Sequence, residues 1–360
     1  MSPDRDAILK ALEQVIDPEL KRPVTELEMV RDVLVDGPHV TVTIALTVAG
    51  CPLRSSFQEQ VDRFVGAVPG VGSVRLEFDV MSPEEKAALS ARLRGGRPEK
   101  GLSLDPGTRV LAIASGKGGV GKSTLTVGIA AALAERGERV GVLDADVYGH
   151  SIPHMLGVHQ RPVVVDRMIV PPVRGELKLM SIGFFLDDNS PVMWRGPMLH
   201  RALEQFLSDV HWGELDTLVV DMPPGTGDVS ISLGQLLPRA EAVIVTTPQP
   251  AAQQVAVRAA QMAQKTGMRV VGVIENMSRL VGTGQELFGS GGGRRLAEEV
   301  GAPLLGEVPL DPALREAADA GIPITEAAPA SEGAAAVVAL ADALRATRRG
   351  AIRKPLSVVS

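Results

Sequence analysis

The chain has 360 residues, enough for two domains of ordinary size, and 45% of them are hydrophobic, enough for a large core. Its formal net charge of −6 argues against a protein whose main task is to coat nucleic acid, because such proteins carry a basic surface. A single cysteine, Cys51, excludes an intrachain disulfide framework and any site that takes several cysteines from one chain. The polar N-terminus and the lack of a long apolar run predict a cytoplasmic protein without membrane contact.

Residues 1–90 are predicted to form a small α+β domain. Apolar residues at helical spacing begin it, and the alternating run 40–48 is typical of a half-buried strand. The preceding run 30–35 joins that strand through Asp36 and Gly37, which form a hairpin-turn signal. A second helix and another alternating run follow, so the predicted order is α-β-β-α-β.

The pattern changes after a charged segment rich in glycine and proline, residues 91–107, which is predicted to be a linker. Residues 108–347 contain short apolar runs that do not alternate with polar residues, so both faces of each strand should be buried. This is typical of a mostly parallel sheet flanked by helices, an α/β fold, and residues 348–360 would form a loosely ordered tail. The predicted strands are 110–114, 140–143, 218–220, 242–246, 270–274 and 304–308, and the predicted helices are 122–136, 198–209, 251–266, 291–300 and 331–347.

The strongest functional signal is the sequence GKGGVGKST at residues 116–124, which fits the phosphate-binding pattern G-x-x-x-x-G-K-[ST]. Glycines allow consecutive backbone N–H groups to surround phosphate oxygens, and the N-terminus of the following helix adds partial positive charge. Lys122 should reach the β- and γ-phosphates of ATP, and the Ser123 hydroxyl should bind Mg²⁺. The predicted nucleotide-binding residues of this P-loop are Gly116, Lys117, Gly118, Gly119, Val120, Gly121, Lys122, Ser123 and Thr124.

Acidic residues at the ends of two predicted strands complete this site. Asp221 follows the apolar run 218–220 and would hold Mg²⁺ or its water. Asp144 and Asp146 follow the strand 140–143 and project to the same side if the segment is extended. An isolated Asp-x-Asp is more often a polar loop, but its place one strand after the P-loop favours a role in ordering the attacking water.

Lys117 is a second lysine within the loop, which the general pattern does not require. One interpretation is a solvated surface lysine. The other is a charge offered across a dimer interface to the partner's nucleotide, as an arginine finger is.

Longer strings of residues resemble one branch of the P-loop proteins. The loop itself resembles the deviant Walker A motif of the SIMIBI class, which includes MinD, ParA and the nitrogenase iron protein. Further strings resemble the Mrp/ApbC family of iron–sulfur cluster carrier ATPases, and the N-terminal part resembles the small iron–sulfur-maturation domain often fused to Mrp proteins. These strings are LDADVYGHSIP at 143–153, WRGPM at 194–198, DMPPGTGD at 221–228, ENMS at 275–278 and FGSGGG at 288–293, with DPE at 17–19 and GCP at 50–52 in the N-terminal part.

The resemblance implies a homodimer that binds ATP and hydrolyses it slowly, coupled to the handling of a cluster or partner. Lys117 would act in trans, Asp146 would polarise the hydrolytic water, and Asp144 would lie near the metal. Asn276 would read the adenine edge, because a side-chain amide donates and accepts at once. The implied partners are apo iron–sulfur proteins or assembly factors, and neither a nucleic acid nor a membrane.

The chain departs from the family pattern where the cluster ligands are expected. The family usually places Cys-x-x-Cys between the ENMS and FG strings, whereas residues 278–288 contain neither cysteine nor histidine. A thiolate-ligated cluster therefore cannot form there. Cys51 precedes a predicted helix, which favours a thiolate and a role as an iron–sulfur ligand or transfer residue, alone or with Cys51 of a second chain. The alternative for Cys51 is a small buried hydrophobe at a strand–helix corner.

The sequence thus favours an ATPase that binds iron–sulfur clusters and transfers them to apoproteins, or assists their assembly. The alternative is a MinD- or ParA-like positioning or regulatory switch that carries no cluster. A MinD-like protein should end in an amphipathic membrane helix, whereas residues 348–355 are broken by Gly and Pro. A ParA-like protein should carry a basic DNA-binding face, for which Arg258, Lys265 and Arg269 are too sparse.

Overall fold

The computed structural model describes residues 3–48, 53–94, 103–147, 149–185 and 196–347. Cys51 and the predicted tail lie outside these residues, as do two residues of the WRGPM string. The chain divides into two compact units, one of residues 1–108 with 158–216 and the other of residues 109–157 with 217–360.

The N-terminal part of the first unit has the predicted α-β-β-α-β order. β1 and β2 are antiparallel, and the turn between them includes Gly37 with φ +57°, where glycine costs least. β2 and β3 are parallel and are connected through α2, whose Phe57 and Val61 are buried in the core. Helix α3 was not predicted and extends past residue 90. The elements are α1 (Arg5–Leu12), β1 (Val30–Asp36), β2 (His39–Leu46), α2 (Arg54–Phe64), β3 (Ser73–Val80) and α3 (Pro83–Arg94).

The rest of the first unit consists of short strands and one longer helix. β6 pairs with β7 and β8 pairs with β9, both antiparallel. Of these elements only the helix was predicted, because strands this short show no hydrophobic period. Trp212 is fully buried beyond the helix, and its indole N–H donates to the Phe206 carbonyl at 3.0 Å. The elements are β6 (Val163–Val165), β7 (Met168–Val170), β8 (Val173–Arg174), β9 (Leu177–Ser181), η1 (Ile182–Phe185) and α6 (Gly196–Ser208).

The second unit contains the parallel sheet that the apolar runs predict. Its strands lie in the order β13-β12-β11-β4-β10-β5 and pair in parallel throughout. Its strands are β4 (Arg109–Ser115), β5 (Val140–Asp144), β10 (Thr217–Asp221), β11 (Glu241–Thr246), β12 (Arg269–Leu280) and β13 (Leu304–Leu310). Its helices are α4 (Lys122–Glu135), α5 (Ile152–Met155), α7 (Asp228–Leu236), α8 (Pro250–Lys265), α9 (Gly292–Val300), α10 (Pro312–Ala320), α11 (Ile324–Ala327) and α12 (Glu332–Ala346).

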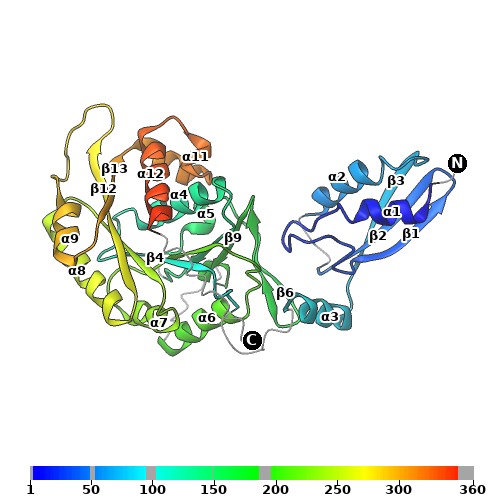
Figure 1. Ribbon diagram of the computed structural model, residues 1–360, viewed down its shortest axis with the longest axis horizontal. Helices are drawn as coiled ribbons and strands as arrows, with labels where there is room; N and C mark the ends of the chain where they lie inside the picture. The colour runs from blue at the N-terminus through cyan, green and yellow to red at the C-terminus, as the bar shows by residue number, and fades with distance from the viewer. Residues whose placement is uncertain (1–2, 49–52, 95–102, 148, 186–195, 348–360) are drawn as a thin grey trace, which may run out of the picture. The chain divides into compact units, whose positions relative to one another are not determined.

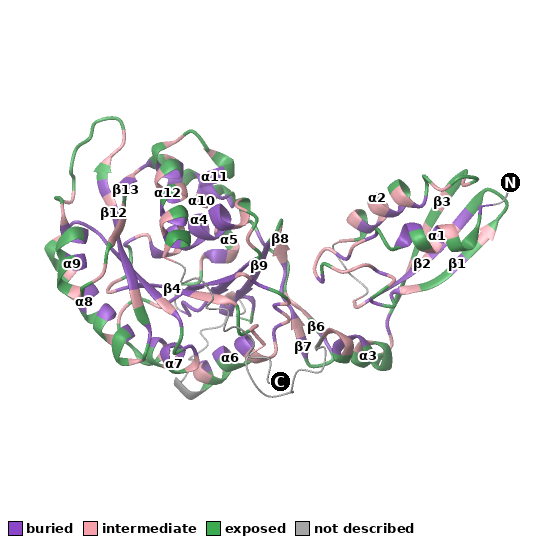
Figure 2. Ribbon diagram, in the orientation of Figure 1, coloured by how far each residue is buried: buried purple, intermediate pink, exposed green. Residues whose placement is uncertain are grey.

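Helices cover both faces of this sheet. α4 packs with α12, and α8 packs with α7 and α9, with the strands between the two groups (Figure 1). Every residue of β5 and β10 is buried, and Figure 2 shows the same burial across the middle of the unit. Two helical layers require strands that are apolar on both faces, so the predicted α/β class is confirmed. In the described part of the chain, no helix combines the length and apolarity that crossing a membrane demands.

The strand order creates a place for a ligand. From β4 the chain crosses over β10 to reach β5, and from β10 it crosses back over β4 to reach β11. Because such crossovers are right-handed, their helices leave on opposite faces of the sheet. The carboxyl ends of β4 and β10 therefore border a crevice, which is where parallel sheets of this kind bind ligands.

One buried ion pair joins the opposite end of the sheet to α12. The guanidinium of Arg109 lies 2.5 Å from Glu241 of β11 and donates to the Leu344 carbonyl at 2.6 Å. Replacing Arg109 by alanine should lower the free energy of unfolding by about 3 kcal/mol, because the Glu241 carboxylate stays largely buried with less compensation. Chemical denaturation measures this change. Arg315→Ala, which removes an exposed pair with Asp319, should leave stability nearly unchanged, and equal effects of the two variants would contradict this account.

Candidate nucleotide-binding site

The P-loop connects β4 to α4 at the crevice. Gly119 and Gly121 have φ values of +76° and +81°, in the left-handed region that glycine adopts without a steric penalty. Gly116 lies against α8, and a Cβ there would come within 2.2 Å of the Val255 backbone. The N-cap residue of α4, Gly121, has no side chain with which to cap the helix. The first N–H groups of the helix can therefore bind an anion, which the helix dipole also favours.

The carboxylate of Asp221 is the centre of the site. It stands at the end of β10 and is fully buried. The ammonium of Lys122 and the hydroxyl of Ser123 each lie 2.6 Å from Oδ2 of Asp221, and the Thr126 hydroxyl lies 2.7 Å from Oδ1. The structure thus brings together the lysine predicted for phosphate and the two residues predicted for Mg²⁺.

The other two predicted aspartates lie beside this group. Asp144 ends β5 in register with Asp221, and its carboxylate accepts the backbone N–H groups of Asp146 and Ile152 at 3.3 and 3.4 Å. Asp146 follows in the loop, with Oδ2 3.6 Å from the Lys122 ammonium. Asp146 thus contacts the lysine predicted to bind phosphate, and Asp144 accepts hydrogen bonds from the loop backbone.

The chemistry of these donors fits Mg²⁺. The Ser123 hydroxyl and the Asp221 carboxylate are oxygen donors, which Mg²⁺ prefers, and they already contact each other. Within residues that the structure describes, no three His, Cys, Asp or Glu side chains are placed to hold a metal ion together. Mg²⁺ commonly takes one or two carboxylates together with substrate phosphates and water. The site therefore suits a cation that arrives with a nucleotide.

Asn276 lies directly against the P-loop. Its amide N–H donates to the Val120 carbonyl at 2.8 Å, and a Cβ on Gly121 would lie 2.1 Å from the same amide nitrogen. The following residue, Met277, has φ +58°, and the pairing of β12 with β13 shifts register between Asn276 and Leu280. Such irregularities turn a side chain away from the regular pleat. The Asn276 amide thus links β12 to the loop, and its contact with adenine stays a prediction.

Lys117 is held within its own chain. Its ammonium lies 3.2 Å from the side-chain oxygen of Gln249, the residue that precedes α8. The same oxygen accepts the Thr247 hydroxyl at 3.3 Å. Lys117 is therefore hydrogen-bonded in the single chain, and an action on a partner's nucleotide would require it to leave Gln249.

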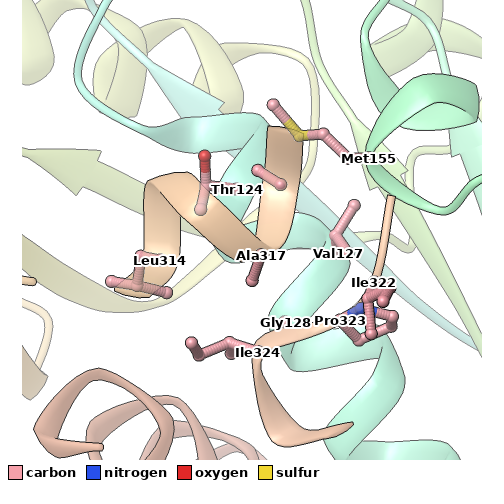
Figure 3. A pocket seen from close by; sticks show the side chains of 10 residues that line it. Thr124, Val127, Gly128, Met155, Leu314, Ala317, Ile322, Pro323 and Ile324 are labelled. Atoms are coloured by element: carbon pink, nitrogen blue, oxygen red, sulfur yellow. The ribbon is translucent and has the colours of Figure 1, made fainter. Parts of the chain in front are cut away.

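Thr124 differs from its neighbours in the motif. Figure 3 shows its side chain beside Met155, Leu314 and Ala317, around a small apolar cavity between α4, α5, α10 and α11. The side chain thus takes part in helix packing. The prediction that Thr124 binds nucleotide then depends on its backbone N–H in the first turn of α4.

Two residues that contact the site were not predicted from the sequence as site residues. Thr126 stands four residues after Lys122, so helical spacing alone could have placed it on the same face. Gln249 reaches Lys117 only through the fold, and no local signal marks it. Glu275 precedes Asn276 on β12 and accepts the backbone N–H of Gly293 at the start of α9, and burial raises the pKa of its carboxyl while that N–H opposes the rise.

Comparisons with known proteins agree with this geometry. Residues 107–345 match a family model described as the NUBPL iron-transfer P-loop NTPase, and residues 5–76 match that of an iron–sulfur cluster assembly protein. The iron–sulfur cluster carrier protein of Mycobacterium tuberculosis is 53% identical over 96% of this chain and 94% of its own length. That of Synechocystis is 43% identical over 93% and 95%.

Solved structures show the same fold. A nucleotide-binding protein from Archaeoglobus fulgidus, in complex with ADP, matches with a TM-score of 0.52 and 35% identity, over 64% of this chain and 91% of that one. The cell division ATPase MinD of Pyrococcus furiosus matches with a TM-score of 0.54 over 67% and 99%, and at 24% identity it shows the fold alone. The predicted resemblance is confirmed, and the chain belongs to the family of iron–sulfur cluster carrier P-loop NTPases.

Proposed function

We propose that this chain is a cytoplasmic, homodimeric ATPase that binds an iron–sulfur cluster and transfers it to apoproteins, or assists its assembly, while hydrolysing ATP slowly. The contact of Lys122, Ser123 and Asp221 at the N-terminus of α4 is the observation that carries the ATPase part. This contact supports the proposed roles of Lys122 as the phosphate-binding cation, Ser123 as a hydroxyl ligand of Mg²⁺ and Asp221 as its carboxylate. The family supports the cargo.

Nucleotide binding would exchange one set of contacts for another. Without nucleotide, the buried Lys122 ammonium is neutralised by Asp221. Phosphate oxygens would replace that carboxylate as its partner, which leaves Asp221 and Ser123 to Mg²⁺. Mg²⁺, when bound, supplies positive charge against the charge that develops on the phosphates. Asp146 would orient the attacking water, and Asn276 would contact the base.

The cargo site must differ from the usual one of the family. A dimer of this chain has two thiols, one Cys51 from each subunit, fewer than the four that iron–sulfur clusters usually take. The remaining ligands would have to come from other side chains, a small thiol or the acceptor protein. A cluster held by so few protein thiolates would leave readily by ligand exchange, which suits a carrier.

Mutation can separate the proposed role of Lys122 in binding nucleotide from that of Asp146 in orienting the reacting water. Lys122→Ala should abolish nucleotide binding, because α4 (Lys122–Glu135) contains no other lysine or arginine. Asp146→Ala should keep nucleotide affinity and lower turnover about 100-fold or more, as expected for a residue that orients the reacting water. Calorimetry with ADP and single-turnover hydrolysis of ATP measure the two effects. Normal turnover in Asp146→Ala would overturn its proposed role.

The proposed action of Lys117 in trans predicts complementation between two inactive variants. Lys117→Ala and Asp146→Ala should each be inactive alone. In a mixed dimer, the subunit that lacks Lys117 keeps Asp146 and receives Lys117 from its partner. Random mixing should therefore restore about one quarter of wild-type activity, because half of the dimers carry one complete site of two. No recovery on mixing, with mixed dimers shown by affinity pull-down, would contradict action in trans.

Anaerobic reconstitution with iron and sulfide tests the cargo. We expect the wild-type protein to bind a cluster and Cys51→Ala to lose it, because thiolates are the usual ligands and this chain has one. Iron per dimer and the visible spectrum are the measurements. Absence of a cluster in both proteins would contradict direct carriage, and a cluster retained by Cys51→Ala would exclude Cys51 as an essential ligand. Lys122→Ala is a control, since the cluster should not need the P-loop.

A further inference from the structure

The Thr126 hydroxyl has no role in the phosphate-binding motif, yet it contacts the central carboxylate. Thr126 and Asp221 are both fully buried, and Thr126 lies one helical turn after Lys122 on the face of α4 that meets β10. Its Oγ1 is 2.7 Å from Oδ1 of Asp221 and 3.0 Å from the carbonyl oxygen of Lys122.

The Thr126 hydroxyl can donate its one proton fully to only one of these two oxygens. A hydroxyl donates one hydrogen, and both a carboxylate and a backbone carbonyl only accept. The carboxylate is the shorter contact and the charged acceptor, and hydrogen bonds to charged groups are the stronger ones. The proton of Thr126 therefore belongs mainly to Oδ1 of Asp221.

The two oxygens of this carboxylate are held in different ways. Oδ2 accepts Lys122 and Ser123, the two residues that a nucleotide and its Mg²⁺ would engage. Oδ1 accepts Thr126, whose hydroxyl lies deeper along α4. When Lys122 and Ser123 leave Oδ2, Thr126 is the remaining side-chain donor of the three and fixes the orientation of the carboxylate.

We propose that Thr126 is a positioning residue for the metal-binding carboxylate: by anchoring Oδ1 of Asp221, it presents Oδ2 to Mg²⁺ or to its water. The inference rests on the proposed function, in which Asp221 has that role. Thr126 does not touch the reacting atoms, so its loss should weaken the metal and spare metal-free nucleotide binding.

The test uses the full chain and Mn²⁺, titrated in the presence of ADP and followed by its electron paramagnetic resonance signal. Thr126→Val removes the hydroxyl at nearly constant volume and should raise the half-saturating Mn²⁺ concentration about 10- to 100-fold, as removal of a partner of a metal ligand does. ADP affinity in EDTA should stay within about threefold of wild type, and Thr126→Ser should restore Mn²⁺ binding. If the valine variant does not fold, Thr126→Ala removes the same hydroxyl.

A matched control lies on the same strand. Thr217 is buried at the other end of β10, and its hydroxyl donates to Glu138 at 2.7 Å, so Thr217→Val removes an equivalent bond far from the site. It should leave Mn²⁺ binding unchanged. Wild-type Mn²⁺ binding in Thr126→Val, or equal losses of Mn²⁺ and metal-free ADP binding, would overturn the inference, as would a serine variant that behaves like valine.

A variant of Asp221 itself separates this inference from the proposed function. Asp221→Asn should weaken Mn²⁺ at least as much as Thr126→Val does. If Asp221→Asn binds Mn²⁺ normally, the proposed metal role of Asp221 fails. If Asp221→Asn is weakened and Thr126→Val is normal, only the role of Thr126 fails.

Discussion

The buried carboxylate of Asp221 is the constraint on which the site depends. An ionised carboxylate without contact to water is costly unless charge and hydrogen bonds compensate it. Among the residues that the structure describes, the side chains that compensate it, Lys122, Ser123 and Thr126, come from the first turns of one helix. The end of β10 therefore fixes the rotation and height of α4 against the sheet. It also holds the N-terminus of α4 at the crevice before any ligand arrives.

This arrangement explains how the site can keep its buried charges compensated without nucleotide and still exchange partners when a nucleotide binds. Neutralising Lys122 with Asp221 avoids two unpaired buried charges in the absence of nucleotide. A phosphate that became the partner of Lys122 would leave the Asp221 carboxylate less compensated, and a cation bound at Asp221 would restore that compensation. Metal would then strengthen nucleotide binding through this one ammonium, without being required for it. Lys117 also has a partner in its own chain, and its contact with Gln249 would have to break before Lys117 could act on another subunit.

Much of the fold could be predicted, because the six central strands are buried on both faces and therefore form uninterrupted apolar runs. The strands β6 to β9 could not be predicted, since two to five residues are too few to show a hydrophobic period. In the site, the P-loop glycines and the acids at strand ends follow from local sequence. Gln249 does not, because only the strand order brings this residue, 132 positions further along the chain, to Lys117. Helical periodicity could have placed Thr126 on the same face of the helix as Lys122, but the P-loop pattern covers only residues 116–124.

Residues 278–288, where the family pattern would place Cys-x-x-Cys, include a tight turn. After β12 the chain turns with the Leu280 N–H donating to the Gln285 carbonyl at 2.9 Å and the Gly284 N–H donating to the Leu280 carbonyl at 2.9 Å. Gly282 and Gly284 have positive φ, which such a tight turn favours. Backbone hydrogen bonds and glycines thus close this loop. The contacts of Asp221 with Lys122, Ser123 and Thr126 do not involve residues of this loop. A different set of residues in the loop is therefore compatible with the same arrangement around Asp221.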